Sequence, residues 1–160
     1  MLRKVIAALL FLCIFCIGNL SNANAESNQI FEVPVTKHSN QWKVELGEVK
    51  YASKMARPKK GESDMYSLKI TNIGKEVYNA EFETYRDEPN SKTKYGLSLE
   101  DEQKGVFGNG KNVSFANLPI HVKANEFEVV VSWHDKPVTL KDGTVDKGRE
   151  YKETFTFTRN

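Results

Sequence analysis

Apolar and polar side chains alternate with a period of two along most of this chain. The clearest case is a segment in which Phe127, Val129, Val131 and Trp133 are separated by single residues that are mostly polar. Such alternation is typical of a strand that buries one face. The same pattern recurs at residues 42–51, 66–71, 78–84, 95–99, 113–115 and 151–157, and more weakly at 31–35. The alternation therefore predicts about seven or eight strands.

No window after residue 25 sustains the i, i+3, i+4, i+7 spacing of an amphipathic helix. Residues 26–160 hold 13 Val against 6 Leu and 5 Ala, a ratio that favours strands over helices. Each strand segment has one apolar and one polar face, as in antiparallel sheets with one face in water. We predict an all-β, antiparallel β-sandwich over residues 42–160, preceded by a polar leader at 26–41.

The first 25 residues have a different composition from the remainder. Arg3 and Lys4 precede an apolar run of 14 residues from Val5 to Gly18, and Ala23-Asn24-Ala25 supplies a small-x-small cleavage pattern. This arrangement predicts a signal-peptide helix cleaved after Ala25 and a secreted protein. The alternative is an uncleaved N-terminal segment that anchors the chain, although the apolar run ends at Gly18 and is shorter than the roughly 20 apolar residues that span a bilayer.

Charge and cysteine content exclude several classes of protein. The net charge of +2 comes from Arg3 and Lys4, so residues 26–160 balance 21 basic against 21 acidic side chains. This balance excludes a polybasic nucleic-acid binder. Both cysteines, Cys13 and Cys16, lie in the predicted signal peptide. The exported part therefore has no disulfide framework and no thiol for catalysis.

One segment carries a family resemblance. From Tyr66 to Phe82, a strand ends in Asn72-Ile73-Gly74 and a second alternating strand follows. This stretch resembles the strand–turn–strand of immunoglobulin-like modules on bacterial surface and secreted proteins. The resemblance implies an immunoglobulin-like or fibronectin-like sandwich. Independently of the resemblance, Gly74 in the turn is free to adopt positive φ. Such modules serve adhesion, spacing, inhibition and ligand capture alike, so the resemblance implies no particular activity.

Two charged segments and one aromatic residue are candidate interaction surfaces. The first segment places four positive charges within seven residues, and the second has several carboxylates in the segment after Trp133. The candidate residues are Lys54, Arg57, Lys59, Lys60, Tyr85, Asp142 and Asp146. The basic segment could contact an anionic cell-wall polymer or a membrane surface, or it is an ordinary polar loop. Tyr85 lies on the polar phase of its strand, which predicts an exposed aromatic contact.

The acidic segment lacks the spacing of a calcium-binding EF-hand, and four basic residues interleave with its carboxylates. We expect a solvated hairpin there, with Asp142-Gly143 as a tight turn. The three histidines are His38, His121 and His134, and none has the spacing of a known metal motif. Residues 96–100 lack the second glycine of a serine nucleophile elbow. We therefore predict no metal, no cofactor and no catalytic residue.

These observations favour a secreted, non-enzymatic binding or interaction module at the cell surface or in the extracellular space. Its partner would be a protein or a cell-envelope polymer, with no nucleic acid and no stable membrane insertion after cleavage of the signal. Three alternatives stay open. They are a proteinase-inhibitor-like protein presenting residues 105–110, a structural or assembly subunit that pairs through an edge strand, and a metal-dependent enzyme or carrier.

Overall fold

A computed structural model describes residues 29–159, apart from the side chains of residues 98–100. The described chain is all-β and contains no helix, and hence no helix that could cross a membrane. Its strands are β1 (Val35–His38), β2 (Trp42–Gly47), β3 (Ser63–Asn72), β4 (Val77–Asp87), β5 (Lys94–Phe107), β6 (Asn112–His121), β7 (Glu126–His134), β8 (Val138–Thr139), β9 (Val145–Asp146) and β10 (Glu150–Thr158). The predicted signal peptide lies outside the described residues.

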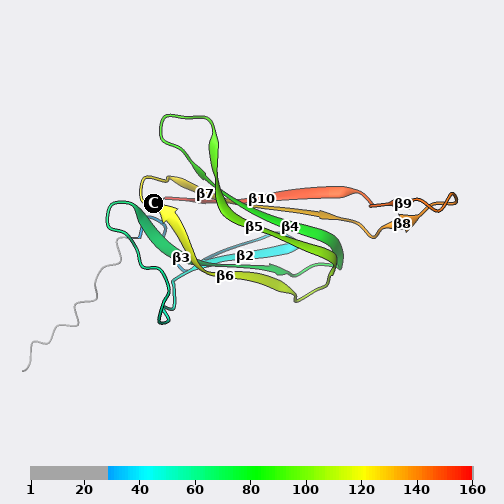
Figure 1. The fold of residues 1–160 in the computed structure, drawn as a ribbon, viewed down its shortest axis with the longest axis horizontal. Coiled ribbons are helices and arrows are strands. Elements are labelled where there is room, and N and C mark those ends of the chain that lie inside the picture. The colour runs from blue at the N-terminus through cyan, green and yellow to red at the C-terminus, as the bar shows by residue number, and fades with distance from the viewer. Residues whose placement is uncertain (1–28, 160) are drawn as a thin grey trace, which may run out of the picture.

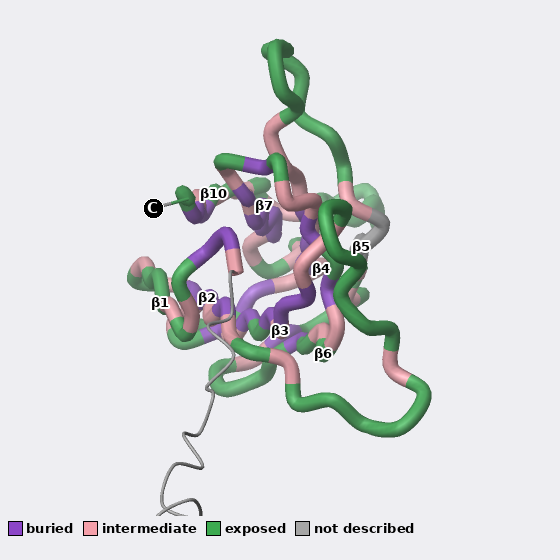
Figure 2. Tube along the Cα trace, turned by 90° about the vertical axis from the view of Figure 1, so that its left-hand side faces the viewer, coloured by how far each residue is buried: buried purple, intermediate pink, exposed green. Residues whose placement is uncertain are grey.

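Eight of the strands form two four-stranded antiparallel sheets that pack face to face (Figures 1 and 2). One sheet has the order β1-β2-β3-β6 and the other β10-β7-β4-β5. The short β8–β9 hairpin forms a third sheet that projects from one end of the sandwich (Figure 1). The all-β antiparallel prediction is therefore confirmed. The strands at residues 94–107 and 112–121 are longer than the alternation indicated.

The core lies between the two sheets and is built from the alternating residues. Trp42, Val44 and Leu46 on β2 are fully buried, as are Phe127, Val129 and Val131 on β7. The Trp42 ring lies 5.6 Å from Phe82 and 5.6 Å from Trp133, so it links the two sheets directly. Figure 2 shows buried residues concentrated between the layers.

The sandwich begins earlier in the chain than the predicted boundary at Trp42. Strand β1 pairs with β2, and Ile30 and Phe31 belong to the core. The Phe31 N–H donates a hydrogen bond to the Tyr66 hydroxyl oxygen over 3.1 Å. Burial of that hydroxyl raises the pKa of Tyr66 to about 12. Part of the segment interpreted as a polar leader is thus integral to the fold.

The turn that carries the family resemblance takes the chain from one sheet to the other. Asn72 is fully buried, and its Nδ2 donates hydrogen bonds to the carbonyls of Lys75 and Phe107 at 2.9 and 2.8 Å. Its Oδ1 accepts from Gln41 Nε2 at 2.7 Å and from the Gly74 N–H at 3.0 Å. The side chain therefore uses both its donors and its acceptor to fix this corner.

Gly74 is required here for a different reason from the one the sequence suggested. It is not among the residues with positive φ, so the expectation of a left-handed conformation is wrong. A Cβ at Gly74 would instead lie 2.5 Å from Gln41 Oε1 and 2.9 Å from the Asn40 carbonyl oxygen. The absence of a side chain permits this close approach of the two segments.

Candidate functional site

The four basic residues singled out in the sequence lie in the segment at residues 48–62 that connects β2 to β3. Their segment, residues 54–60, is called the basic loop. The Arg57 guanidinium lies 4.3 Å from the centre of the Tyr51 ring, and Lys59 Nζ lies 3.4 Å from Glu62 Oε2. The backbones of Lys59 and Ser63 exchange two hydrogen bonds of 3.0 Å. These contacts hold the loop in a defined shape with its cations exposed to solvent.

The basic loop forms one wall of a groove of about 490 Å³, which we call the loop groove. Its lining residues are Ala56, Arg57, Lys59, Glu62, Ser63, Met65, Leu97, Asn117, Pro119 and His121. Strands β3, β5 and β6 supply the apolar residues Met65, Leu97 and Pro119. The site thus combines an apolar surface with cations, and its volume is typical of small-ligand sites.

Asn117 ties the loop to the strand beneath it. Its Nδ2 donates a hydrogen bond of 3.2 Å to the Ala56 carbonyl oxygen. Its Oδ1 is buried and accepts no hydrogen bond within the described part of the chain. Asn117 therefore lines the groove and carries a buried acceptor whose hydrogen-bonding capacity is unused within the described residues.

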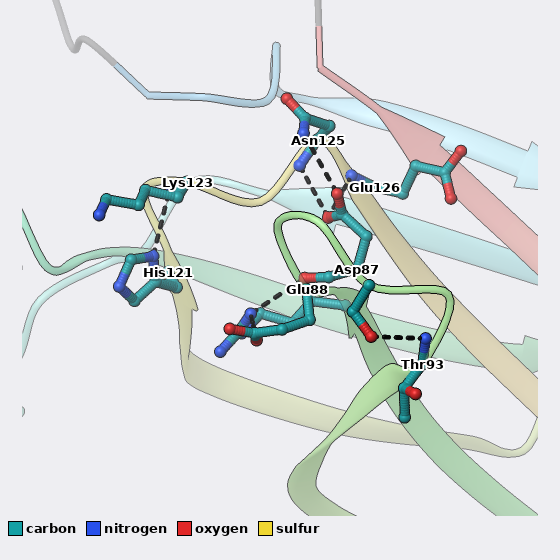
Figure 3. A network of polar contacts seen from close by, with 9 residues as sticks. Asp87, Glu88, Thr93, His121, Lys123, Asn125 and Glu126 are labelled. Carbon is teal, nitrogen blue, oxygen red and sulfur yellow. Dashed lines mark hydrogen bonds and ion pairs between the residues drawn. The ribbon is translucent and has the colours of Figure 1, made fainter.

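A polar network at the same end of the molecule orients His121 (Figure 3). His121 Nδ1 accepts a hydrogen bond of 3.0 Å from the Lys123 N–H, so the neutral ring carries its proton on Nε2. In the same network, Asp87 accepts hydrogen bonds from the N–H groups of Asn125 and Glu126, at 2.8 and 2.9 Å. Asp87 thereby fastens the end of β4 to the turn between β6 and β7.

The Asp87 carboxylate gives a pH-dependent prediction. Its partial burial acts to raise the pKa, but hydrogen bonds from Glu126 and Asn125 outweigh that effect and lower the pKa below its ordinary value. Because the folded pKa is depressed, the stabilisation is complete above the ordinary pKa of about 4 and is lost as pH falls through the folded pKa. We expect Asp87→Asn to cost about 1 kcal/mol at pH 7.

Urea unfolding of the wild type and Asp87→Asn at a series of pH values checks this prediction. The stability difference should shrink steadily below about pH 4. A difference that stays constant down to pH 2 would show that the carboxylate charge contributes nothing.

The acidic candidates lie at the opposite end of the sandwich from the basic loop, on the projecting β8–β9 hairpin (Figure 1). Asp142 Oδ1 accepts hydrogen bonds from the hydroxyl and the N–H of Thr144, at 2.7 and 3.0 Å, and these lower its pKa. Asp146 Oδ1 accepts from the Gly148 N–H at 2.9 Å. Gly143 has a φ of 84°, which confirms the predicted tight turn. Asp142 thus stabilises the turn of the hairpin, and Asp146 contacts the segment that leads from β9 to β10.

Tyr85 is half-buried, in contrast to the exposed aromatic that its phase suggested. Its hydroxyl donates to Glu83 Oε1 over 2.9 Å, and Gly96 on the neighbouring strand lies against its ring.

The histidines occupy separate strands, and no group of three or more metal-ligating side chains occurs within residues 29–159. Residues 105–110 place Phe107 in the core and leave Val106 exposed.

The structure thus brings Arg57 and Lys59 to one groove and separates them from Tyr85, Asp142 and Asp146. Sequence reasoning missed the apolar lining and Asn117. Pro119 was the one sequence signal for this groove, because a proline within a strand indicates that the strand lies at the edge of its sheet.

The sequence matches a family described as YozF-like secreted proteins over residues 25–160. It is 31% identical over 140 residues to a Bacillus subtilis (strain 168) protein named "Uncharacterized protein YozF", an alignment that covers 80% of each chain. No solved structure matches the chain.

Proposed function

This chain belongs to the YozF-like secreted protein family, and we propose that its domain is a non-enzymatic module that binds anionic cell-envelope polymers through the loop groove. The observation that carries the proposal is the position of Arg57 and Lys59 beside an apolar surface. Cations attract a polyanion at long range, and the apolar lining contacts the carbon backbone of a polymer. The B. subtilis relative's name states no ligand, so the ligand class rests on this geometry.

We further propose that the sandwich is of the immunoglobulin-like class. The order β2-β3-β6 corresponds to strands A-B-E of such a fold, and β10-β7-β4-β5 corresponds to G-F-C-C′. In immunoglobulin-like modules, loops at the ends of the sandwich commonly carry the binding site. The basic loop joins the strands equivalent to A and B at one such end.

Binding is tested with purified polyglycerol phosphate as the polyanion, using isothermal calorimetry at low ionic strength. We expect Arg57→Gln, Lys59→Gln and Lys60→Gln, combined in one variant, to weaken binding at least about tenfold, because each cation near an anionic surface contributes roughly 1 kcal/mol. Binding should also weaken as salt is added.

A matched control removes three cations at the other end of the molecule, by Lys141→Gln, Lys147→Gln and Arg149→Gln. This variant has the same net charge as the first, so it should bind nearly as well as the wild type. Equal losses of affinity in both variants would mean that binding depends on the net charge of the protein and not on the position of the cations. No heat with the wild type would refute the proposed ligand class.

A further inference from the structure

Strand β10 lies at the edge of its sheet and differs from the other three edges. In the described residues it pairs with β7 on one side and has no strand partner on the other. Its pairing with β7 runs through nine residue pairs without a shift in register. From Thr154 to Thr158 the sequence is Thr-Phe-Thr-Phe-Thr, with no charge, proline or glycine. These properties make a strand edge ready to pair with another chain.

The other edges each carry a feature that discourages pairing. Strand β1 is four residues long and follows Pro34. Strand β6 contains Pro119 and shifts register against β3. Strand β5 shifts register twice against β4 and carries Asp101, Glu102 and Lys104. Proteins use such prolines, charges and bulges to prevent edge-to-edge association. Residues 154–158 of β10 carry none of these features, so this part of the β10 edge is the one that the sequence leaves open.

Grooves of about 340 and 630 Å³ separate β10 from β1 of the facing sheet. Residues 153–156 line the larger groove together with residues 36–39 of β1. The β10 edge is consequently accessible rather than covered by the neighbouring layer.

Residues 154–158 of β10 read the same in both directions about Thr156. If two antiparallel copies are centred there, Thr156 lies opposite its own counterpart, Thr154 opposite Thr158, and Phe155 opposite Phe157. Threonine pairs and aromatic pairs are favourable cross-strand neighbours. A symmetric dimer requires this kind of self-complementary patch.

The same register also pairs opposite charges. Glu153 of one copy lies opposite Arg159 of the other, twice in the dimer, and both side chains share the face of the strand that carries Phe155 and Phe157. Glu153 Oε2 is buried and has no hydrogen-bond partner among the described residues. Arg159 Nη1 donates to the Val122 carbonyl oxygen over 3.2 Å, and its guanidinium has further donors for a carboxylate.

From these observations we infer that two copies of this protein associate through antiparallel β10 edges, joining two four-stranded sheets into one continuous eight-stranded sheet. The interface lies on a different edge from the loop groove, so its test is independent of the proposed ligand. A single pair of edge strands makes a small interface, so the dimer should form reversibly at micromolar concentrations.

Sedimentation equilibrium of the purified exported protein over a concentration series tests the inference. We expect twice the chain mass at high concentration, with association about tenfold weaker in Thr156→Lys, which places two lysines opposite each other at the twofold axis. Ser114→Lys, at an exposed position on the β6 edge, should associate like the wild type. A single-chain mass up to about 0.5 mM would overturn the inference.

Charge exchange and crosslinking test the register itself. Glu153→Arg should weaken association, and adding Arg159→Glu in the same chain should restore it. Residues 26–160 contain no cysteine, so Thr156→Cys in the exported protein introduces a single thiol and should form a disulfide-linked dimer on mild oxidation. Thr154→Cys should not, because its two copies would lie about 13 Å apart along the strands. Crosslinking of Thr154→Cys as readily as Thr156→Cys would contradict the register.

Discussion

We expect Trp42→Ala to lower the free energy of unfolding by about 4 kcal/mol, in the range for removing a buried aromatic side chain. Trp42 is fully buried and lies within 5.6 to 5.8 Å of Phe82, Phe107 and Trp133, ring centre to ring centre. It belongs to one sheet, whereas these three neighbours belong to the other. Truncation would therefore leave a cavity at the contact between the layers. Urea unfolding followed by circular dichroism measures the loss.

Trp42→Phe is the variant to compare with Trp42→Ala, because it keeps an aromatic ring between the sheets. The Trp42 indole N–H has no hydrogen-bond partner in the described part of the chain, so replacing it by phenylalanine gives up packing but no hydrogen bond. The variant should lose less than half as much stability as Trp42→Ala. Tyr95→Ala, at a side chain 55% exposed, should cost less than either. A loss below about 1 kcal/mol for Trp42→Ala would contradict its position between the sheets.

The second large effect is expected at the corner between β3 and β4. Asn72→Ala removes two donors and an acceptor from a buried site and leaves the Phe107 carbonyl without the hydrogen bond it receives from Asn72. Because an unsatisfied buried polar group costs about 1–3 kcal/mol, we expect a loss of about 3 kcal/mol from the several contacts together. The same unfolding measurement applies.

Asn72→Asp distinguishes the effect of side-chain size from the effect of the lost hydrogen bonds on stability at this corner. The substitution keeps the shape of the side chain but turns a carboxylate oxygen toward the carbonyls of Lys75 and Phe107. It should destabilise at least as strongly as Asn72→Ala at neutral pH. Asn112→Ala, at an exposed position, is the control and should change stability by less than about 0.5 kcal/mol. An Asn72→Asp variant with nearly the stability of the wild type would show that the Nδ2 donors contribute little to stability.

The amphipathic strands could be predicted from the sequence because burial of one face imposes a period of two. Trp42, Val44 and Leu46 show this in full, and Phe127, Val129, Val131 and Trp133 lie in the core as expected. Val130 and Ser132, on the opposite face of β7, are buried as well. The extended length of β5 could not be predicted, because charged residues interrupt its alternation near Glu102. The burial of Ile30 and Phe31 was not predicted, because two adjacent apolar residues in a polar segment show neither the period of a strand nor that of a helix.

The candidate site was predictable only in part. The basic loop is a local feature of sequence, so its four cations could be recognised directly. The groove beside it is a tertiary feature, since Leu97 and Pro119 reach it from different strands and different sheets. Likewise, the network around Asp87 joins residues separated by 38 or more positions in the chain. Spacing along the sequence carries no information on such contacts.

The most direct test of the proposed function maps the bound polymer onto the chain. Polyglycerol phosphate is titrated into the ¹⁵N-labelled protein while backbone amide chemical shifts are recorded. We expect the shift changes to concentrate at residues 54–63 and 117–121, with little change in the β8–β9 hairpin. Shifts confined to that hairpin, or an unchanged spectrum at saturating polymer, would contradict binding at the loop groove.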